Sequence, residues 1–128
     1  MQNYEDLQVW RKAHSLTLQI YRDTRCFPSD ERFGLTSQIR RSCSSIGANL
    51  AEGCGRRSDP EMARFGSDCD GVGRRALVSS RLARDLNLLP PAAFEHLRSD
   101  LSEVIRMLSS LSLKLKPRAE VVQLRAKS

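Results

Sequence analysis

The side chains most able to bind a ligand in this chain are arginines, and several of them stand in adjacent pairs. Seventeen of the 21 basic residues are arginine, and the formal net charge is +6. A guanidinium group is planar and binds a phosphate or a carboxylate through two parallel hydrogen bonds. The pattern predicts salt-dependent binding of RNA or DNA without sequence preference. The candidate residues are Arg40, Arg41, Arg56, Arg57, Arg64, Arg74 and Arg75.

The same arginines have a second interpretation, in which they form ion pairs on the surface or between subunits. The acidic side chains available for these pairs are Glu52, Glu61, Asp68 and Asp70. The protein would then be an interaction scaffold without a nucleic-acid partner. Aromatic residues make up only 5% of the chain, which does not favour a platform for stacking single-stranded bases. The sequence leaves both functions open.

Residues 71–76 read G-x-G-x-x-A, the pattern of dinucleotide-binding sites. That pattern holds a cofactor where it follows a strand within a βαβ unit, but here it falls inside an expected helix. The two glycines are better interpreted as a close helix crossing or a weak point in the helix. We therefore expect no cofactor.

Neither histidine stands at a spacing that predicts catalysis or metal binding. His96 directly follows Glu95, whereas the di-iron sites of helical bundles use Glu-x-x-His. His14 lies in an apolar arc, which favours a hydrogen-bonded core histidine. The nucleophile motif G-x-S-x-G does not occur. We expect no catalytic residue, no metal ligand and no enzymatic activity.

The cysteines form no C-x-x-C pair, so their spacing predicts no zinc site. They are Cys26, Cys43, Cys54 and Cys69, and three of the four fall on stripes expected to be buried. The first six residues are polar and acidic, unlike a signal peptide. No apolar run approaches the roughly 18 residues that span a bilayer. These features predict a cytoplasmic protein with reduced thiols and no membrane partner.

Apolar residues recur at helical spacing through four segments, and no strand-like alternation is long enough to compete. The segments cover about residues 4–26, 31–53, 58–87 and 91–116. The fourth carries a heptad repeat that runs from Phe94 to Leu115. We predict an all-α, antiparallel up-down-up-down four-helix bundle over residues 1–116. Residues 117–128 are expected to form a disordered tail.

Individual residues refine these segments. Gly47 interrupts the second segment at a cost of up to about 1 kcal/mol relative to alanine, which indicates close packing there. Ser58 and Glu61 fit a capping box at the start of the third segment. Pro91 suits the first turn of the fourth segment.

The first segment has an apolar face wider than a surface helix needs. One sector of this face holds Val9, Ala13, Leu16 and Ile20, and the adjacent sector holds Leu7, Trp10, His14, Thr17 and Tyr21. So broad a face can contact two neighbours, one of which would belong to another subunit. We predict a homo-oligomer with Val9, Ala13, Leu16 and Ile20 at its interface.

Several stretches of the chain together resemble the four-helix-bundle protein family of 23S rRNA intervening sequences. The stretches are residues 4–10 (YEDLQVW), 33–41 (FGLTSQIRR) and 45–53 (SIGANLAEG), followed by Ser58, Glu61, 64–65 (RF) and 86–89 (LNLL). The resemblance implies a small cytosolic bundle that assembles into a homopentameric ring with a central pore. A relative, the accessory variability protein of diversity-generating retroelements, is a positively charged ring that binds nucleic acid and a reverse transcriptase. A binding or scaffolding role is therefore implied rather than an enzyme.

The chain departs from the family pattern at two places. Residues 45–49 read SIGAN where the family usually has Ser-Ile-Pro-Ser-Asn, so a flexible glycine replaces a proline kink. In the third segment, the usual Gly-Ser…Glu-Leu-Glu appears as Gly71-Val72…Arg75-Ala76-Leu77. Two expected carboxylates are absent and one of these positions is an arginine, which makes the local field more positive.

Overall fold

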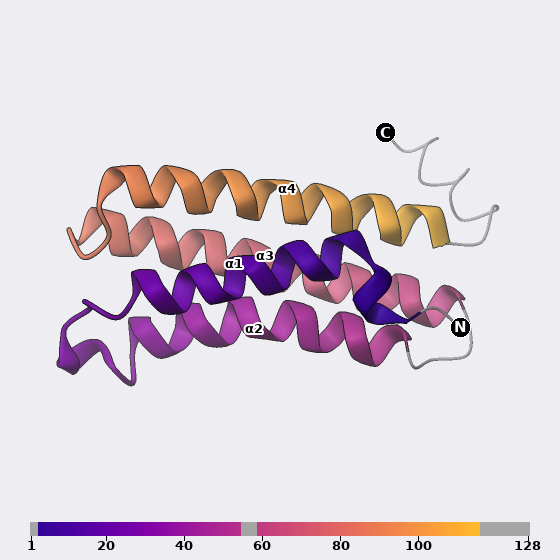
Figure 1. The fold of residues 1–128 in the computed structure, drawn as a ribbon, viewed down its shortest axis with the longest axis horizontal. Coiled ribbons are helices and arrows are strands. Elements are labelled where there is room, and N and C mark those ends of the chain that lie inside the picture. The colour runs from indigo at the N-terminus through magenta and orange to yellow at the C-terminus, as the bar shows by residue number, and fades with distance from the viewer. Residues whose placement is uncertain (1–2, 55–58, 116–128) are drawn as a thin grey trace.

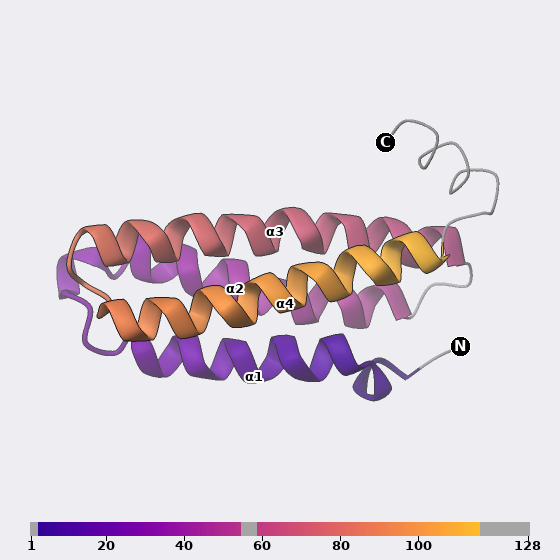
Figure 2. The same cartoon turned by 90° about the horizontal axis from the view of Figure 1, so that it is seen from above.

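The computed structural model describes residues 3–54 and 59–115, and within these ranges it contains helices and no strand. Four α-helices lie side by side (Figures 1 and 2), which confirms the all-α, four-helix prediction. Their bounds are α1 Gln8–Asp23, α2 Leu35–Cys54, α3 Asp59–Asp85 and α4 Pro91–Leu115, with 3-10 turns at Tyr4–Asp6 and Ser29–Glu31. Each helix packs against its neighbours in the chain, and α1 also packs against α4. The expected capping box at Ser58 and the tail at 117–128 lie outside the described residues.

The first helix is shorter than the sequence predicts. Leu7 is extended, with φ −73° and ψ 123°, and it separates the 3-10 turn from α1. Thr24 closes the other end of α1, because its hydroxyl donates to the Ile20 carbonyl at 2.8 Å. Both ends therefore fall a few residues inside the predicted range of 4–26.

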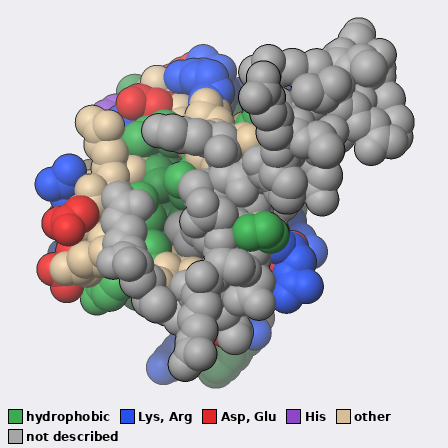
Figure 3. Space-filling model, turned by 90° about the vertical axis from the view of Figure 1, so that its right-hand side faces the viewer, with side chains coloured by type: hydrophobic (Ala, Val, Ile, Leu, Met, Phe, Trp, Pro, Cys, Tyr) green, Lys and Arg blue, Asp and Glu red, His purple; other side chains and the backbone are tan. Residues whose placement is uncertain are grey.

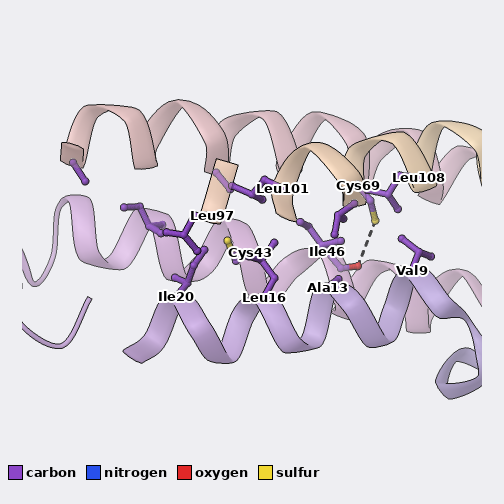
Figure 4. Packing of buried hydrophobic residues seen from close by; sticks show 14 of the residues in the cluster. Val9, Ala13, Leu16, Ile20, Cys43, Ile46, Cys69, Leu97, Leu101 and Leu108 are labelled. Atoms are coloured by element: carbon purple, nitrogen blue, oxygen red, sulfur yellow. Dashed lines mark hydrogen bonds between the residues drawn. The ribbon is translucent and has the colours of Figure 1, made fainter. Parts of the chain in front are cut away.

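The core of the bundle contains the α1 residues that were predicted to form a subunit interface. Val9, Ala13, Leu16 and Ile20 are at most 5% exposed within the single chain. Figure 4 shows them directed at Cys43 and Ile46 of α2 and at Leu97, Leu101 and Leu108 of α4. The interface prediction at these four residues is wrong, because side chains covered by their own bundle present no surface to a second copy.

Helix α4 contributes a row of large apolar side chains to this core. The heptad prediction is confirmed for Phe94, Leu97, Leu101, Val104 and Leu108, all of which are buried, and Leu111 packs against the cluster. Pro91 is the first residue of α4, as predicted. Asn87, with φ 63°, takes the left-handed conformation that ends a helix, and the Leu88 amide donates back to the Ala83 carbonyl at 2.9 Å.

Among the α3 residues whose burial the structure describes, the buried ones are small, and several larger apolar side chains are exposed. These buried residues are Cys69, Gly73, Ala76, Ser79, Ser80 and Ala83. The Ser80 hydroxyl donates to the Ala76 carbonyl at 2.8 Å, so its burial leaves no unsatisfied donor. In contrast, Val78, Leu82 and Leu86 are 69%, 49% and 52% exposed. We call these three residues the α3 stripe: Val78 and Leu82 share one face of the helix, and Leu86 directly follows its last residue with its N–H donating to the Leu82 carbonyl at 2.9 Å.

Two glycines permit close approach between helices. A Cβ atom added at Gly73 would lie 3.0 Å from Ile105 Cγ1 of α4, and one added at Gly47 would lie 3.2 Å from Trp10 Nε1 of α1. These contacts confirm the predicted close packing at Gly47 and a close crossing at one glycine of the 71–76 motif. The other glycine of that motif, Gly71, has open space around its Cβ position.

The surface carries mixed charges. Seen from the end of the bundle where α1 begins and α4 ends, the coloured charged side chains lie around the outside and hydrophobic side chains lie between them (Figure 3). On the α1–α4 side, Lys12 pairs with Glu103 at 2.7 Å and with Asp100 at 3.8 Å. None of the described helices is long and apolar enough to cross a bilayer.

Candidate nucleic-acid interface

A polar groove lies between α2 and α3, and two of the predicted arginines face it from opposite sides. Arg41 comes from α2 and Arg75 from α3. The groove has a volume of about 500 Å³. We call it the α2–α3 groove. Its lining consists of Phe33, Gly34, Ser37, Gln38, Arg41, Ser42, Ser45, Val72 and Arg75.

The two arginines of the groove are not paired with any described carboxylate. Arg41 and Arg75 are both exposed, and neither forms an ion pair with a carboxylate in the part of the chain that the structure describes. Hydroxyl and amide groups at Ser37, Gln38 and Ser42 add further hydrogen-bonding capacity. Such a site suits a ligand that carries negative charge and several acceptor oxygens.

An exposed aromatic ring stands beside these polar groups. Phe33 is 90% exposed, and the Arg32 guanidinium lies 5.5 Å from the centre of its ring. Sequence reasoning did not select this residue. The signal was present, since Phe33 lies outside the apolar stripe of Leu35 and Ile39, but a lone apolar residue before a helix is common enough to pass unnoticed.

Arg40 has a different role from its neighbour Arg41. Its Nε donates to Thr24 Oγ1 at 2.8 Å, its Nη2 donates to the Tyr21 carbonyl at 3.3 Å, and its guanidinium lies 4.5 Å from the centre of the Tyr21 ring. These contacts join α2 to the last turn of α1. Arg40 therefore has a role in the fold, and its predicted contact with nucleic acid stays a prediction.

The remaining predicted arginines do not gather at the groove. Arg74 forms an ion pair with Asp70 at 3.3 Å on the exposed side of α3, as the alternative interpretation expected for that acid. Arg64 is exposed in the first half of α3 and does not line the groove. Arg56 and Arg57 lie outside the described residues. The structure thus brings together two of the seven, Arg41 and Arg75.

The family model for the 23S rRNA-intervening sequence protein matches residues 5–110. The chain belongs to the 23S rRNA-intervening sequence protein family. The matched range includes both walls of the α2–α3 groove and most of all four helices. No curated protein matches the chain.

His14 does not lie in the core, where the sequence predicts it. His14 is exposed, and its ring stacks on Trp10 with the ring centres 5.0 Å apart and the planes 9° from parallel. Trp10 also meets the edge of Tyr4 at 4.9 Å. The second apolar sector of the first helix is therefore divided: Leu7 belongs to the core, whereas Trp10 packs at its edge against Gly47 and His14 is exposed.

The four cysteines of this family member differ in how far they are buried. Cys43 and Cys69 are buried, Cys54 is half-buried and Cys26 is exposed, and all four are free thiols. Burial raises the pKa of Cys43 from 9.0 to about 12. Burial, and next the charge of Asp68, raise the pKa of Cys69 to about 12. These thiols are protonated at neutral pH, so they behave as small apolar side chains and not as nucleophiles.

Proposed function

We propose that this member of the family is a non-enzymatic, cytoplasmic, up-down-up-down four-helix bundle that binds RNA or DNA through the α2–α3 groove. The observation that carries the proposal is the position of Arg41 and Arg75. Their guanidinium groups face one groove from two helices, and no described carboxylate pairs with either of them. In comparison, Arg40 and Arg74 are each engaged within the chain.

Phosphate is the ligand group that best fits these residues. Each guanidinium can bind two phosphate oxygens at once, and the serine hydroxyls of the groove can donate to others. The net charge of +6 draws a polyanion toward the surface at long range. Contacts of this kind carry no base specificity, so RNA and DNA are both expected to bind.

A salt titration tests this proposal. Binding of a labelled nucleic acid is measured by fluorescence anisotropy at several salt concentrations for the native chain, Arg41→Ala and Arg75→Ala. Each substitution should weaken binding and lower the slope of log K against log salt by about 1. Arg81→Ala is the matched control, because Arg81 is exposed on α3 and does not line the groove. Absence of binding at low salt, or an equal loss in the control, would refute the proposal.

We further propose that the chain self-assembles, with five copies as the number that the family resemblance implies. The α3 stripe supports this, because an exposed row of Val78, Leu82 and Leu86 is unfavourable in water and is relieved when a second copy covers it. Arg75 lies one turn before Val78 on the same helix. Assembly through this face would bring the grooves of several copies into one particle and raise their joint affinity for a long polyanion.

A protein-interaction scaffold is the second candidate function. The α3 stripe favours it equally, because the same apolar row could receive another protein, such as the reverse transcriptase that the family resemblance implies. The two functions differ in their response to one change. If the protein is a scaffold, Arg41→Ala alters the stability of an assembly. No nucleic-acid binding is then measurable for the native chain or for any variant.

A further inference from the structure

Phe33 has no evident role in holding the fold. It is 90% exposed, whereas Phe27 and Phe94 are buried in the core. An aromatic ring in water contributes little to folding, because it removes almost no apolar area from solvent. The same ring lines the α2–α3 groove together with both free arginines. Its position therefore needs an explanation outside the packing of the bundle.

The chain holds Phe33 in place through its neighbours. The Glu31 carboxylate accepts the backbone N–H of Leu35 at 3.0 Å and so caps the start of α2. A Cβ atom added at Gly34 would lie 3.1 Å from that same carboxylate oxygen. Phe33 thus sits in a short connection between a 3-10 turn and α2 whose backbone is hydrogen-bonded, with Arg32 N–H donating to the Ser29 carbonyl and Gly34 N–H to the Glu31 carbonyl, and its ring lines the groove.

We propose that the groove binds a single-stranded segment, with one unpaired base stacked on Phe33 and neighbouring phosphates on Arg41 and Arg75. This inference rests on the proposed function and names its substrate class. Arg32 lies over one face of the ring, which leaves the other face for a base. A single exposed ring cannot form an extended platform, consistent with the low aromatic content, but it is sufficient for one base.

The spacing along α2 agrees with such a segment. Leu35 begins α2 two residues after Phe33, and Arg41 lies about 9 Å further along the helix axis at a rise of 1.5 Å per residue. A single strand covers a distance of this order with a few nucleotides. One base at Phe33 and a phosphate at Arg41 therefore belong to one short stretch of a single chain.

A duplex does not satisfy the same contacts. Its bases are paired and stacked on both faces, so none is available to Phe33 unless it is flipped out of the helix. A groove of about 500 Å³ has the volume of a small-molecule pocket, so it can receive part of a single strand but not a double helix. A duplex could still reach Arg41 and Arg75 through one backbone, but without the contribution of stacking.

The test compares a short oligo(dT) and a short oligo(U) with a hairpin duplex, by anisotropy at low salt. Phe33→Leu keeps an apolar side chain and removes the aromatic face, so it should weaken single-strand binding about tenfold and leave duplex binding unchanged. Phe33→Trp keeps a larger aromatic face and should bind single strands at least as tightly as the native chain. The salt slope of both variants should equal that of the native chain, because no charge changes.

Three outcomes separate this inference from the proposed function. If single strands and the duplex bind equally and Phe33→Leu has no effect, the inference is overturned while groove binding stands. If no nucleic acid binds the native chain at low salt, the proposed function fails as well. If Phe33→Leu instead changes the oligomeric state in light scattering, Phe33 belongs to a protein interface and the inference is again overturned.

Discussion

The guanidinium of Arg40 donates to the hydroxyl of Thr24 at 2.8 Å and links α2 to the C-terminal end of α1. Thr24 in turn donates to the Ile20 carbonyl, so the contact reaches the last turn of α1. A positive charge at the C-terminal end of a helix also interacts favourably with the helix dipole. The next residue, Arg41, faces the α2–α3 groove. Two adjacent arginines therefore have separate roles, one in the fold and one at the proposed site.

Arg40→Ala should destabilise the protein without weakening its intrinsic affinity for nucleic acid. Loss of a hydrogen bond to a charged donor and of the contact with Tyr21 should lower the free energy of unfolding by about 1–3 kcal/mol. Urea unfolding measures this change, and anisotropy on the folded variant measures affinity. Arg41→Ala should show the reverse behaviour. If Arg40→Ala kept the native stability but lost much of its affinity for nucleic acid, Arg40 would act at the binding site and not in the fold.

The sequence predicts the four helices because their apolar residues recur at the helical period, but it does not distinguish Arg40 from Arg41. That distinction depends on where the end of α1 lies against α2, which no pattern within α2 contains. The first helix shows the same limit. The sequence predicts its wide apolar face. Which half of that face enters the core depends on how α1 packs against α2 and α4. The sequence therefore predicts Val9 and Leu16 at an interface, whereas both are buried in the core and Trp10 and His14 are more exposed.

The α2–α3 groove could be predicted only in part for a related reason. Arg75 and Arg41 are far apart in sequence, and their meeting across the groove depends on the register between α2 and α3. The composition predicts a polyanion ligand, which stays a prediction, and it cannot select two arginines from seventeen. Gly73 was more informative, because an unfavourable residue within a helix needs a packing reason.

Two glycines of α3 should respond to alanine in opposite directions. Gly71→Ala adds a methyl group in open space, so it should stabilise the protein by about 0.5–1 kcal/mol through helix propensity. Gly73→Ala adds a methyl group 3.0 Å from Ile105 Cγ1. This overpacking should destabilise the protein by about 1–3 kcal/mol. Thermal and urea unfolding of both variants measure the difference. Equal effects would show that α3 and α4 do not approach closely at Gly73.

The buried thiols should make the protein less stable at alkaline pH. Cys43 and Cys69 keep their protons in the folded state until a pKa of about 12, whereas in the unfolded chain they lose them near 9.0. The unfolded state therefore binds fewer protons between these values, and the free energy of unfolding should fall as the pH rises from about 9 to about 12. The contribution of these thiols is fully present below pH 9.

Urea unfolding at a series of pH values measures this slope. Cys43→Ala and Cys69→Ala should each flatten it, and Cys26→Ala, which changes an exposed thiol, is the control. The same burial should protect Cys43 and Cys69 from alkylation in the native state while Cys26 reacts. Rapid native-state labelling of Cys43 would show that the core opens readily around it.

Self-assembly should depend on the α3 stripe and not on the apolar face of α1. Leu82→Gln places a polar group where the stripe requires an apolar contact, so it should reduce the particle mass in light scattering while helical content is kept. Leu18→Gln is the matched control, because Leu18 on α1 is 47% exposed and Leu82 on α3 is 49% exposed. The control should assemble as the native chain does.

Leu16→Ala completes the comparison, because it tests the face that the sequence alone had favoured. Leu16 is 2% exposed in the core, so its truncation should lower the free energy of unfolding by about 2–5 kcal/mol. The folded fraction of this variant should still assemble, since the α3 stripe is intact. If Leu16→Ala instead gave a stable monomer with native unfolding behaviour, Leu16 would contact another copy and the burial of α1 within a single bundle would be wrong.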